Sequence, residues 1–96
     1  MPNESFDEQT CLRRIAKGDE DAARDLLRHF HAFVARLVAL HLPRRMSQED
    51  LTQMIFIKIF QNLDSYAGKV PLQHWISRVA ANTCHNELRA EKQRPE

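Results

Sequence analysis

The segment SQEDLTQMIFIKIFQNL, residues 47–63, decides the fold of this chain. Ser47 followed three residues later by Asp50 is a typical start signal of an α-helix, because the serine side chain can accept a hydrogen bond from a free backbone N–H of the first turn. The isoleucines would also suit a β-strand, but the cap, the length and the absence of alternation favour a helix. At about 100° per residue, its apolar residues cover one broad arc, which predicts a core face made of Leu51, Ile55, Phe56, Ile59, Phe60 and Leu63.

The opposite side of this helix is not purely polar. Its polar residues are Asp50, Gln53, Lys58 and Gln61. Met54 and Ile57 sit among them, where water would be expected. One interpretation is that the packed arc is simply wide, or that a first helix covers both side chains. The other is a surface that docks on another helix, with apolar anchors and a polar rim; the sequence alone leaves both open.

Helix signals continue upstream of this segment. Ser5 and Glu8 form an S-x-x-E capping box, which predicts a helix running to about position 17, and Gly18 suits its C-terminal cap. Asp19 predicts the cap of a second helix, which Pro43 ends. The apolar stripe of that second helix follows three- and four-residue steps: Ala23, Leu26, Leu27, Phe30, Phe33, Val34, Leu37 and Val38.

Downstream, Pro71 suits the first turn of a further helix, because its missing N–H would be unpaired there in any case. One face of that helix is apolar and predicts packing on the core: Leu72, Trp75, Ile76, Val79, Ala80 and Thr83, with Leu88 as a continuation. No internal repeat or low-complexity segment is visible. The sequence therefore predicts an all-α fold, a compact bundle of three main helices plus a shorter N-terminal helix.

The other face of the last helix is polar and rich in amides: Arg78, Asn82, His85, Asn86 and Arg89. A solvated face is the ordinary explanation. Asparagine is, however, a weak helix former that can offer both a donor and an acceptor to the edge of a base. Arginine can bind phosphates, and Tyr66, in the preceding loop, could stack on an unpaired base. The combination hints at single-stranded nucleic acid.

The composition bounds the class of protein. Ninety-six residues make one domain, and a formal net charge of +1 gives no general reason to expect a nucleic-acid surface. Cys11 and Cys84 are far apart and form no C-x-x-C pair, so we expect buried thiols in a reducing compartment. No run approaches the roughly 18 apolar residues of a membrane span. A soluble, cytoplasmic protein without a membrane partner is expected.

The chain shows no pattern typical of catalysis. Its five histidines have no metal-ligand spacing, since His29 and His31 fall on different helix faces and the others are scattered. Cys84 and His85 are adjacent and therefore point in different directions from a helix. There is no glycine-rich phosphate loop. We expect no catalytic residue, no metal site, no cofactor and no small-molecule substrate.

The stretch EDLTQMIFIKIFQNLDSYAGKVPLQHWISRVAANTCHNELR, residues 49–89, resembles the second conserved region of sigma-70-family initiation factors, and most closely the extracytoplasmic-function (ECF) group. The positions that match the family pattern are Glu49, Asp50, Leu51, Gln53, Phe56, Phe60, Leu63, Asp64, Tyr66, Trp75, Ile76, Arg78, Ala80 and Asn82. The upstream segment GDEDAARDLLRHFHAFVARL resembles the family's preceding helices, so the likeness covers about residues 18–94.

The resemblance implies that the helix over 47–63 binds the clamp helices of the RNA polymerase β′ subunit. The residues implied in this contact are Asp50, Gln53, Met54, Ile57 and Gln61. The family usually has an acidic residue at the position of Met54, so we expect apolar packing there in place of one ionic contact with a basic clamp residue.

The resemblance also implies that the minus-ten promoter element is recognised as non-template single strand. The loop Asp64–Val70 with Tyr66, together with Asn82 and Asn86, would form a pocket for a flipped base, whose unstacking costs a few kcal/mol. The residues implied in DNA binding are Tyr66, Lys69, Arg78, Asn82, His85, Asn86 and Arg89. Primary sigma factors carry several aromatic residues in this helix, whereas VAANTCHN has none. This difference predicts limited melting power and a stricter dependence on promoter sequence.

Two-domain sigma factors also carry a helix-turn-helix for the minus-thirty-five element, and nothing after Asn86 could supply it. We expect residues 1–17 to form a leading helix, 18–92 the region 2 domain and 93–96 the start of an interdomain linker, as in the N-terminal domain of a longer factor. The expected partners are core RNA polymerase through its β′ subunit, promoter DNA and, because the subgroup often has one, an anti-sigma factor. The rival interpretations are a helical protein–protein interaction domain without nucleic-acid binding and a duplex binder of helix-turn-helix type.

Overall fold

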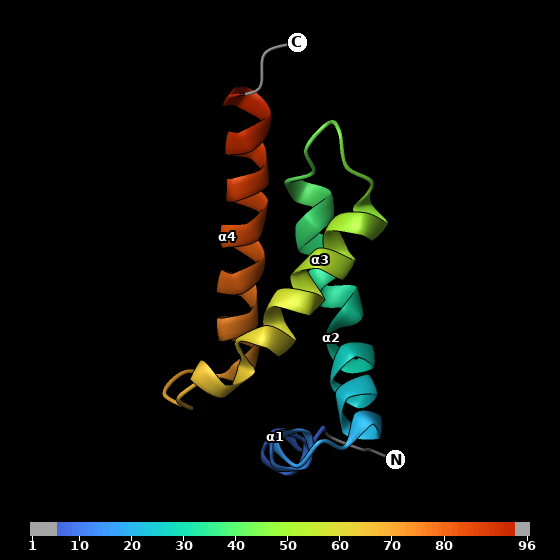
Figure 1. Ribbon diagram of the computed structural model, residues 1–96, viewed down its shortest axis with the longest axis vertical. Helices are drawn as coiled ribbons and strands as arrows, with labels where there is room; N and C mark the ends of the chain where they lie inside the picture. Colours follow the sequence, from blue (N-terminus) through green and yellow to red (C-terminus); the bar gives the residue numbers. More distant parts are fainter. Residues whose placement is uncertain (1–5, 94–96) are drawn as a thin grey trace. The chain divides into compact units, whose positions relative to one another are not determined.

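The computed structural model describes residues 6–93 of the chain. Over this range the chain forms helices and no strand (Figure 1). The elements in chain order are α1 (Glu8–Ala16), α2 (Glu20–Leu40), α3 (Gln48–Gln61), the short 3-10 helix η1 (Leu63–Ser65) and α4 (Leu72–Gln93). The prediction of an all-α fold, with three longer helices and a shorter leading one, is confirmed.

A tight turn joins α1 to α2. Gly18 has a φ of +88°, a conformation that glycine adopts without strain. The backbone N–H groups of Gly18 and Asp19 donate to the carbonyls of Ile15 and Arg14 at 2.9 and 3.0 Å, which is the pattern of a Schellman cap. Asp19 then caps α2, because its Oδ1 accepts from two backbone N–H groups of the first turn at 3.0 and 3.3 Å. The predicted roles of Gly18 and Asp19 are confirmed.

The start of α1 differs from the prediction. Asp7 is the N-cap, since its carboxylate accepts from the backbone N–H of Thr10 at 3.2 Å and from the Thr10 hydroxyl at 2.8 Å. The predicted cap, Ser5, lies outside the described residues. The S-x-x-E motif of Ser5 and Glu8 did not identify the cap. Asp7 takes this role because Thr10 offers it two hydrogen-bond donors, the backbone N–H and the hydroxyl. The Thr10 hydroxyl also lowers the pKa of Asp7 below its usual value.

α2 buries one row of side chains along its whole length, and the row is narrower than predicted. Its members recur at every fourth residue: Ala22, Leu26, Phe30, Val34 and Val38. Leu27, expected in the stripe, is 38% exposed, and Leu37 is only half-buried. The chain divides into two compact units within this helix, between His31 and Ala32. We describe each unit by itself.

In the second unit, α3 and α4 pack on each other and on the second half of α2. Ser47 caps α3 as predicted, because its Oγ accepts from the backbone N–H of Asp50 at 3.0 Å. The Gln48 amide donates to the Ala35 carbonyl at 3.1 Å, which ties the first turn of α3 to α2. Pro71 directly precedes α4, and its carbonyl accepts from the backbone N–H groups of His74 and Trp75.

The core of this unit follows the predicted apolar faces closely. The buried side chains from α3 and α4 are Leu51, Thr52, Ile55, Phe56 and Ile59, and Leu72, Ile76, Ala80, Thr83 and Cys84. Phe60, Leu63, Trp75, Val79 and Leu88, also predicted to face the core, are half-buried. Each fully buried leucine or isoleucine contributes about 1.5–3 kcal/mol of burial free energy. This packing leaves one face of α3 and one face of α4 exposed to water.

Candidate nucleic-acid interface and docking face

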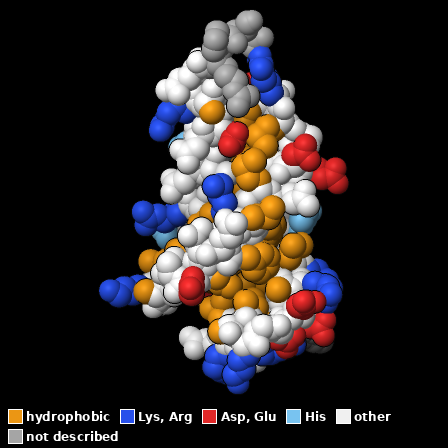
Figure 2. Space-filling view, in the orientation of Figure 1, with side chains coloured by type: hydrophobic (Ala, Val, Ile, Leu, Met, Phe, Trp, Pro, Cys, Tyr) orange, Lys and Arg blue, Asp and Glu red, His pale blue; other side chains and the backbone are white. Residues whose placement is uncertain are grey.

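The outer face of α3 is the side that carries the candidate polymerase-binding residues: Asp50, Gln53, Met54, Ile57 and Gln61. The structure leaves four of them exposed and Met54 half-buried. Ile57 is 52% exposed, which is unusual for a large apolar side chain in the middle of a helix. Figure 2 shows hydrophobic side chains gathered over α3 on the face turned to the viewer.

The two interpretations left open for this face now separate. Met54 is half-buried, which agrees with the interpretation that the core face of α3 is wide. Ile57 stays 52% exposed, so a wide core arc does not account for it. An exposed apolar side chain with polar neighbours suits the centre of a protein contact.

The connection between α3 and α4 is held by its own hydrogen bonds. The Ser65 hydroxyl donates to the Asn62 carbonyl at 2.7 Å, and the Tyr66 backbone N–H donates to the Leu63 carbonyl at 3.1 Å. Gly68 has a φ of +80°, which the turn requires and glycine permits. Lys69, a candidate phosphate ligand, is exposed in this loop. These bonds give the loop a defined conformation.

Tyr66 closes this loop. Its hydroxyl donates a hydrogen bond to the Val70 carbonyl, and its ring lies 5.5 Å from that of Trp75, tilted by 48°. Trp75 precedes Asn82 by seven residues, so both lie on one side of the helix, and half-buried Trp75 stands at the border between the apolar face and the polar face rather than opposite Asn82. Tyr66 thus lies toward the N-terminal end of the side of α4 that carries Asn82. The sequence did not reveal the bond to Val70, because it depends on the conformation of the loop.

The polar face of α4 consists of the five residues singled out from the sequence: Arg78, Asn82, His85, Asn86 and Arg89. All five are exposed. Behind them Thr83 and Cys84 are buried, so the packed core of this unit lies directly behind the face. The exposed amides and guanidinium groups are free to meet a base edge or a phosphate. The structure thus keeps the predicted residues together on one accessible surface.

One neighbour of this face was not predicted. The ring of His41, which follows the last residue of α2, lies 6.2 Å from the ring of His85 in an edge-to-face arrangement. In the sequence, His41 lies just before Pro43, which was predicted to end the second helix, and nothing marked His41 as a site residue. No pattern signalled this contact, because 44 positions separate the two histidines and only the packing of the helices joins them.

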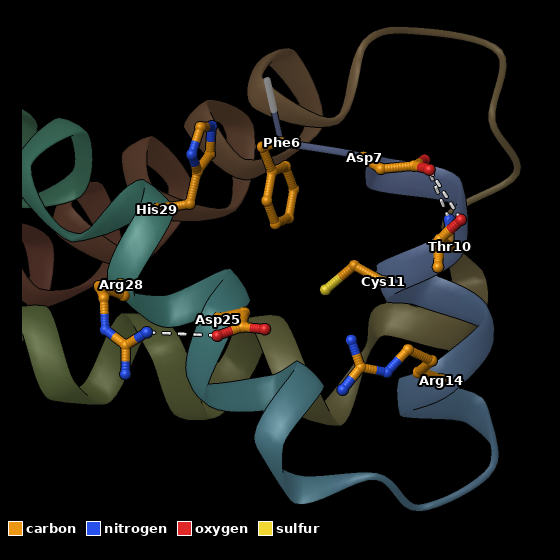
Figure 3. A pocket seen from close by; sticks show the side chains of 8 residues that line it. All are labelled: Phe6, Asp7, Thr10, Cys11, Arg14, Asp25, Arg28 and His29. Atoms are coloured by element: carbon orange, nitrogen blue, oxygen red, sulfur yellow. Dashed lines mark hydrogen bonds and ion pairs between the residues drawn. The ribbon is translucent and has the colours of Figure 1, made fainter. Parts of the chain in front are cut away.

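Two cavities are lined by residues other than the candidate site residues. One cavity, in the first unit, has a volume of about 670 Å³. Figure 3 shows the Cys11 sulfur pointing into it, among Arg14, Arg28, Asp7 and Asp25. The Cys11 thiol donates to the Ala22 carbonyl at 3.2 Å, and burial raises its pKa. Burial raises the pKa of Cys84 as well. Both thiols are free and buried, as expected from the sequence.

The second cavity, of about 370 Å³, lies beside the first turns of α4 and is lined by Phe33, Pro71, Gln73, His74 and Ser77. No described helix is long and apolar enough to cross a membrane. Within residues 6–93, no group of three or more histidine, cysteine, aspartate or glutamate side chains is arranged to hold a metal ion.

Comparison with known proteins bears on these surfaces. A family model described as Sigma-70 region 2 matches residues 23–94. The ECF RNA polymerase sigma-E factor of Escherichia coli K12 is 34% identical over 93 residues, which are 97% of this chain and 48% of that protein. The sigma-E factor of Haemophilus influenzae is 30% identical over 92 residues, or 96% of this chain and 48% of that protein. The chain thus spans about half the length of the curated relatives it matches.

A solved structure is similar over nearly the whole chain. It is the NMR structure of an engineered region 2 of sigmaE in complex with GTAAAA. It has a TM-score of 0.84 and 33% sequence identity to this chain, and the match covers 99% of both.

Proposed function

Because this chain belongs to the sigma-70 family, as its match to region 2 over residues 23–94 shows, we propose that it acts in transcription initiation by binding core RNA polymerase and a promoter element. The proposal has two parts, one for each exposed surface. The outer face of α3 docks on the β′ clamp helices, and the polar face of α4 with the loop before it binds the minus-ten element as non-template single strand.

The observation that carries the DNA part is the similarity to a region 2 solved with GTAAAA bound. In this chain, Asn82 and Asn86 would read base edges, since an amide offers a donor and an acceptor side by side. Lys69, Arg78 and Arg89 would hold phosphates, and His85 would line the same path. Tyr66 would close one side of a pocket for a flipped base.

The polymerase part rests on the outer face of α3. Exposed Ile57 and half-buried Met54 supply apolar anchors. Asp50, Gln53 and Gln61 supply the polar rim that such contacts have. Of all the side chains on this face, Ile57 would lose the most exposed apolar area on docking, so we assign it the largest share of the binding energy.

The remaining parts of the proposal follow from the family. The domain acts in the cytoplasm, where polymerase and promoter are, and has no catalytic activity of its own. An anti-sigma factor is a further proposed partner. The absence of aromatic side chains from VAANTCHN, residues 79–86, supports limited melting power and a stricter dependence on promoter sequence.

A crossed experiment tests both parts. The first assay measures retention of the chain on an immobilised β′ clamp-helix fragment. The second measures its affinity for a fluorescent GTAAAA strand and for a scrambled strand. Both assays are applied to the parent chain, to Ile57→Asp and to Asn82→Ala. Ile57→Asp should weaken clamp binding about tenfold or more and leave DNA binding unchanged. Asn82→Ala should weaken GTAAAA binding by about tenfold or more and leave clamp binding unchanged.

The rivals give different patterns. A protein-interaction domain without nucleic-acid binding would show no difference between GTAAAA and the scrambled strand in any variant. A duplex binder of helix-turn-helix type would bind double-stranded DNA more tightly than the single strand. Equal clamp binding by Ile57→Asp and the parent would refute the docking surface.

A further inference from the structure

The cavity of about 370 Å³ beside the first turns of α4 is lined by groups that suit a flat ring with a polar edge. Phe33 of α2 and Pro71 supply apolar surface, whereas Gln73, His74 and Ser77 supply an amide, an imidazole and a hydroxyl. None of these five lining residues carries a carboxylate. The volume lies at the lower end of the range for small-ligand sites. We name this site the Phe33 cavity.

The polar groups of the Phe33 cavity can be reached from water. Gln73 and His74 are exposed, and Ser77 is half-buried. The Ser77 hydroxyl donates to the His74 carbonyl at 2.7 Å, so its own oxygen can still accept a hydrogen bond. The Gln73 amide offers both donors and an acceptor, as does a neutral imidazole. An aromatic ring with such groups beside it matches the face and the edge of a nucleobase.

The Phe33 cavity borders the polar face of α4. His74 precedes Arg78 by four residues, so these two side chains are neighbours on the surface of the helix. A strand held at Arg78 therefore lies within about one helical turn of the cavity. The first turn of α4 holds no acidic residue that would repel a phosphate there. The path from the polar face to the cavity is thus short and free of opposing charge in that turn.

The Phe33 cavity is distinct from the pocket proposed around Tyr66. Its lining does not include Tyr66, whose ring lies against Trp75 instead. Trp75 and His74 are consecutive residues of a helix, so their side chains point in directions about 100° apart. The two sites nevertheless lie close together, because the Tyr66 hydroxyl donates to the carbonyl of Val70 and the next residue, Pro71, lines the cavity.

We propose that the Phe33 cavity takes up one unstacked base of the strand that the polar face of α4 binds, as a second base pocket beside the one around Tyr66. The inference rests on the proposed function for its ligand. The Phe33 ring stacks on the base, and Gln73 and His74 meet its edge. Capture of this base offsets part of the cost of unstacking it and fixes the path of the strand at the N-terminal end of α4.

The test measures the coupling between a side chain and a base. The probes are single strands that carry GTAAAA with a few nucleotides on either side, and a series in which one base at a time is replaced by an abasic site. Affinity of the whole chain is measured by fluorescence anisotropy for the parent, Phe33→Leu and Gln73→Ala. Phe33→Tyr keeps an aromatic ring, and Gln93→Ala removes the same amide from the exposed far end of α4. Thermal unfolding checks that each variant is folded.

We expect Phe33→Leu to weaken binding of the intact strand about fivefold or more, because the base loses its aromatic platform. Gln73→Ala should weaken it about threefold. Phe33→Tyr and Gln93→Ala should stay within about twofold of the parent. At one abasic position the parent should lose affinity by a similar factor, and Phe33→Leu should cause no further loss there. That position identifies the captured base, and it should differ from the position that couples in the same way to Tyr66→Leu.

The proposal is overturned if Phe33→Leu binds the intact strand as well as the parent does. It is also overturned if the loss in Phe33→Leu is the same at every abasic position, because no single base would then occupy the cavity. Coupling of Phe33 and Tyr66 to the same position would mean one pocket and not two. Failure of the proposed function is seen separately, as a parent chain that binds GTAAAA no better than a scrambled strand.

Discussion

The two connections on either side of α3 are held in opposite ways. The connection over residues 41–47 is fixed from outside, by the burial of Pro43 and by Glu91, which is 47 positions away along the chain. The connection over residues 62–71 is fixed mainly from within, by bonds between residues three or four positions apart. The first therefore depends on the packing of α4, whereas the second can keep much of its shape if that packing loosens.

The largest effect should come from a change that releases both connections at once. Ile55 is fully buried in α3, between them. Ile55→Ala should lower the free energy of unfolding by about 2–5 kcal/mol through lost burial and a residual cavity. Urea unfolding followed by circular dichroism measures this, and binding to both proposed partners should fall with it.

Ile57→Ala is the matched control, since it removes the same atoms from the same helix at a site that is 52% exposed. We expect a change within about 0.5 kcal/mol. Similar losses in the two variants would mean that Ile57 is packed and that the outer face of α3 is not free for a partner.

A smaller effect is expected from strain placed in the internally held connection. Gly68 has a φ of +80°, and an added Cβ would meet nothing within 4 Å. Gly68→Ala should therefore destabilise the chain only through its backbone conformation, by about 1–2 kcal/mol. Amide hydrogen exchange should rise at Ser65 and Tyr66 and stay unchanged at Arg44. A rise at Arg44 as large as at Tyr66 would contradict independent holding of the two connections.

Removal of one oxygen separates two roles of Tyr66. Tyr66→Phe loses the bond to the Val70 carbonyl but keeps the ring against Trp75. It should lower the free energy of unfolding by about 1 kcal/mol. If the hydroxyl shapes the base pocket, affinity for GTAAAA should fall severalfold, with little change for a strand that has an abasic site at the captured position. An unchanged affinity for GTAAAA would mean that the Tyr66 hydroxyl plays no part in DNA binding, which leaves only the ring as a possible contact.

The smallest effect concerns the externally held connection. Glu91→Ala removes the acceptor for the Arg44 backbone N–H, a single bond of 3.2 Å near the surface, and should cost about 0.5 kcal/mol. Hydrogen exchange of the Arg44 backbone amide should increase while that of Tyr66 does not. Glu91→Gln keeps an acceptor oxygen and should protect the Arg44 amide as the parent does. Equal exchange of the Arg44 amide in Glu91→Ala and Glu91→Gln would mean that Glu91 does not hold this connection.

The helices and most of the core could be predicted from the sequence, because they depend on local chemistry. Ser47 and Asp19 cap helices where expected, and the steps between Leu51, Ile55 and Ile59 placed the core face of α3. Asp7 was missed because two cap signals overlap within a few residues. Leu27 was misplaced because a periodic pattern gives the direction of a face but not how far the neighbouring helices cover it.

The candidate sites were predictable as sets of residues but not as surfaces. The polar face of α4 follows from helical spacing alone, and the structure exposes all of it. The contact of His41 with His85 and the bond of Arg44 to Glu91 could not be predicted, since each joins segments that are more than 40 positions apart. The roles of the individual residues in binding stay predictions until the variants are measured.

The shielded thiols of Cys11 and Cys84 make the chain a convenient host for site-directed labels. Alkylating reagents attack the thiolate, and burial, which raises the pKa of both native cysteines, disfavours that form. A cysteine introduced at exposed Val70 or Arg45 would react first. A fluorophore or spin probe could then follow each connection in turn as the proposed partners are added, with every native residue outside the labelled position in place.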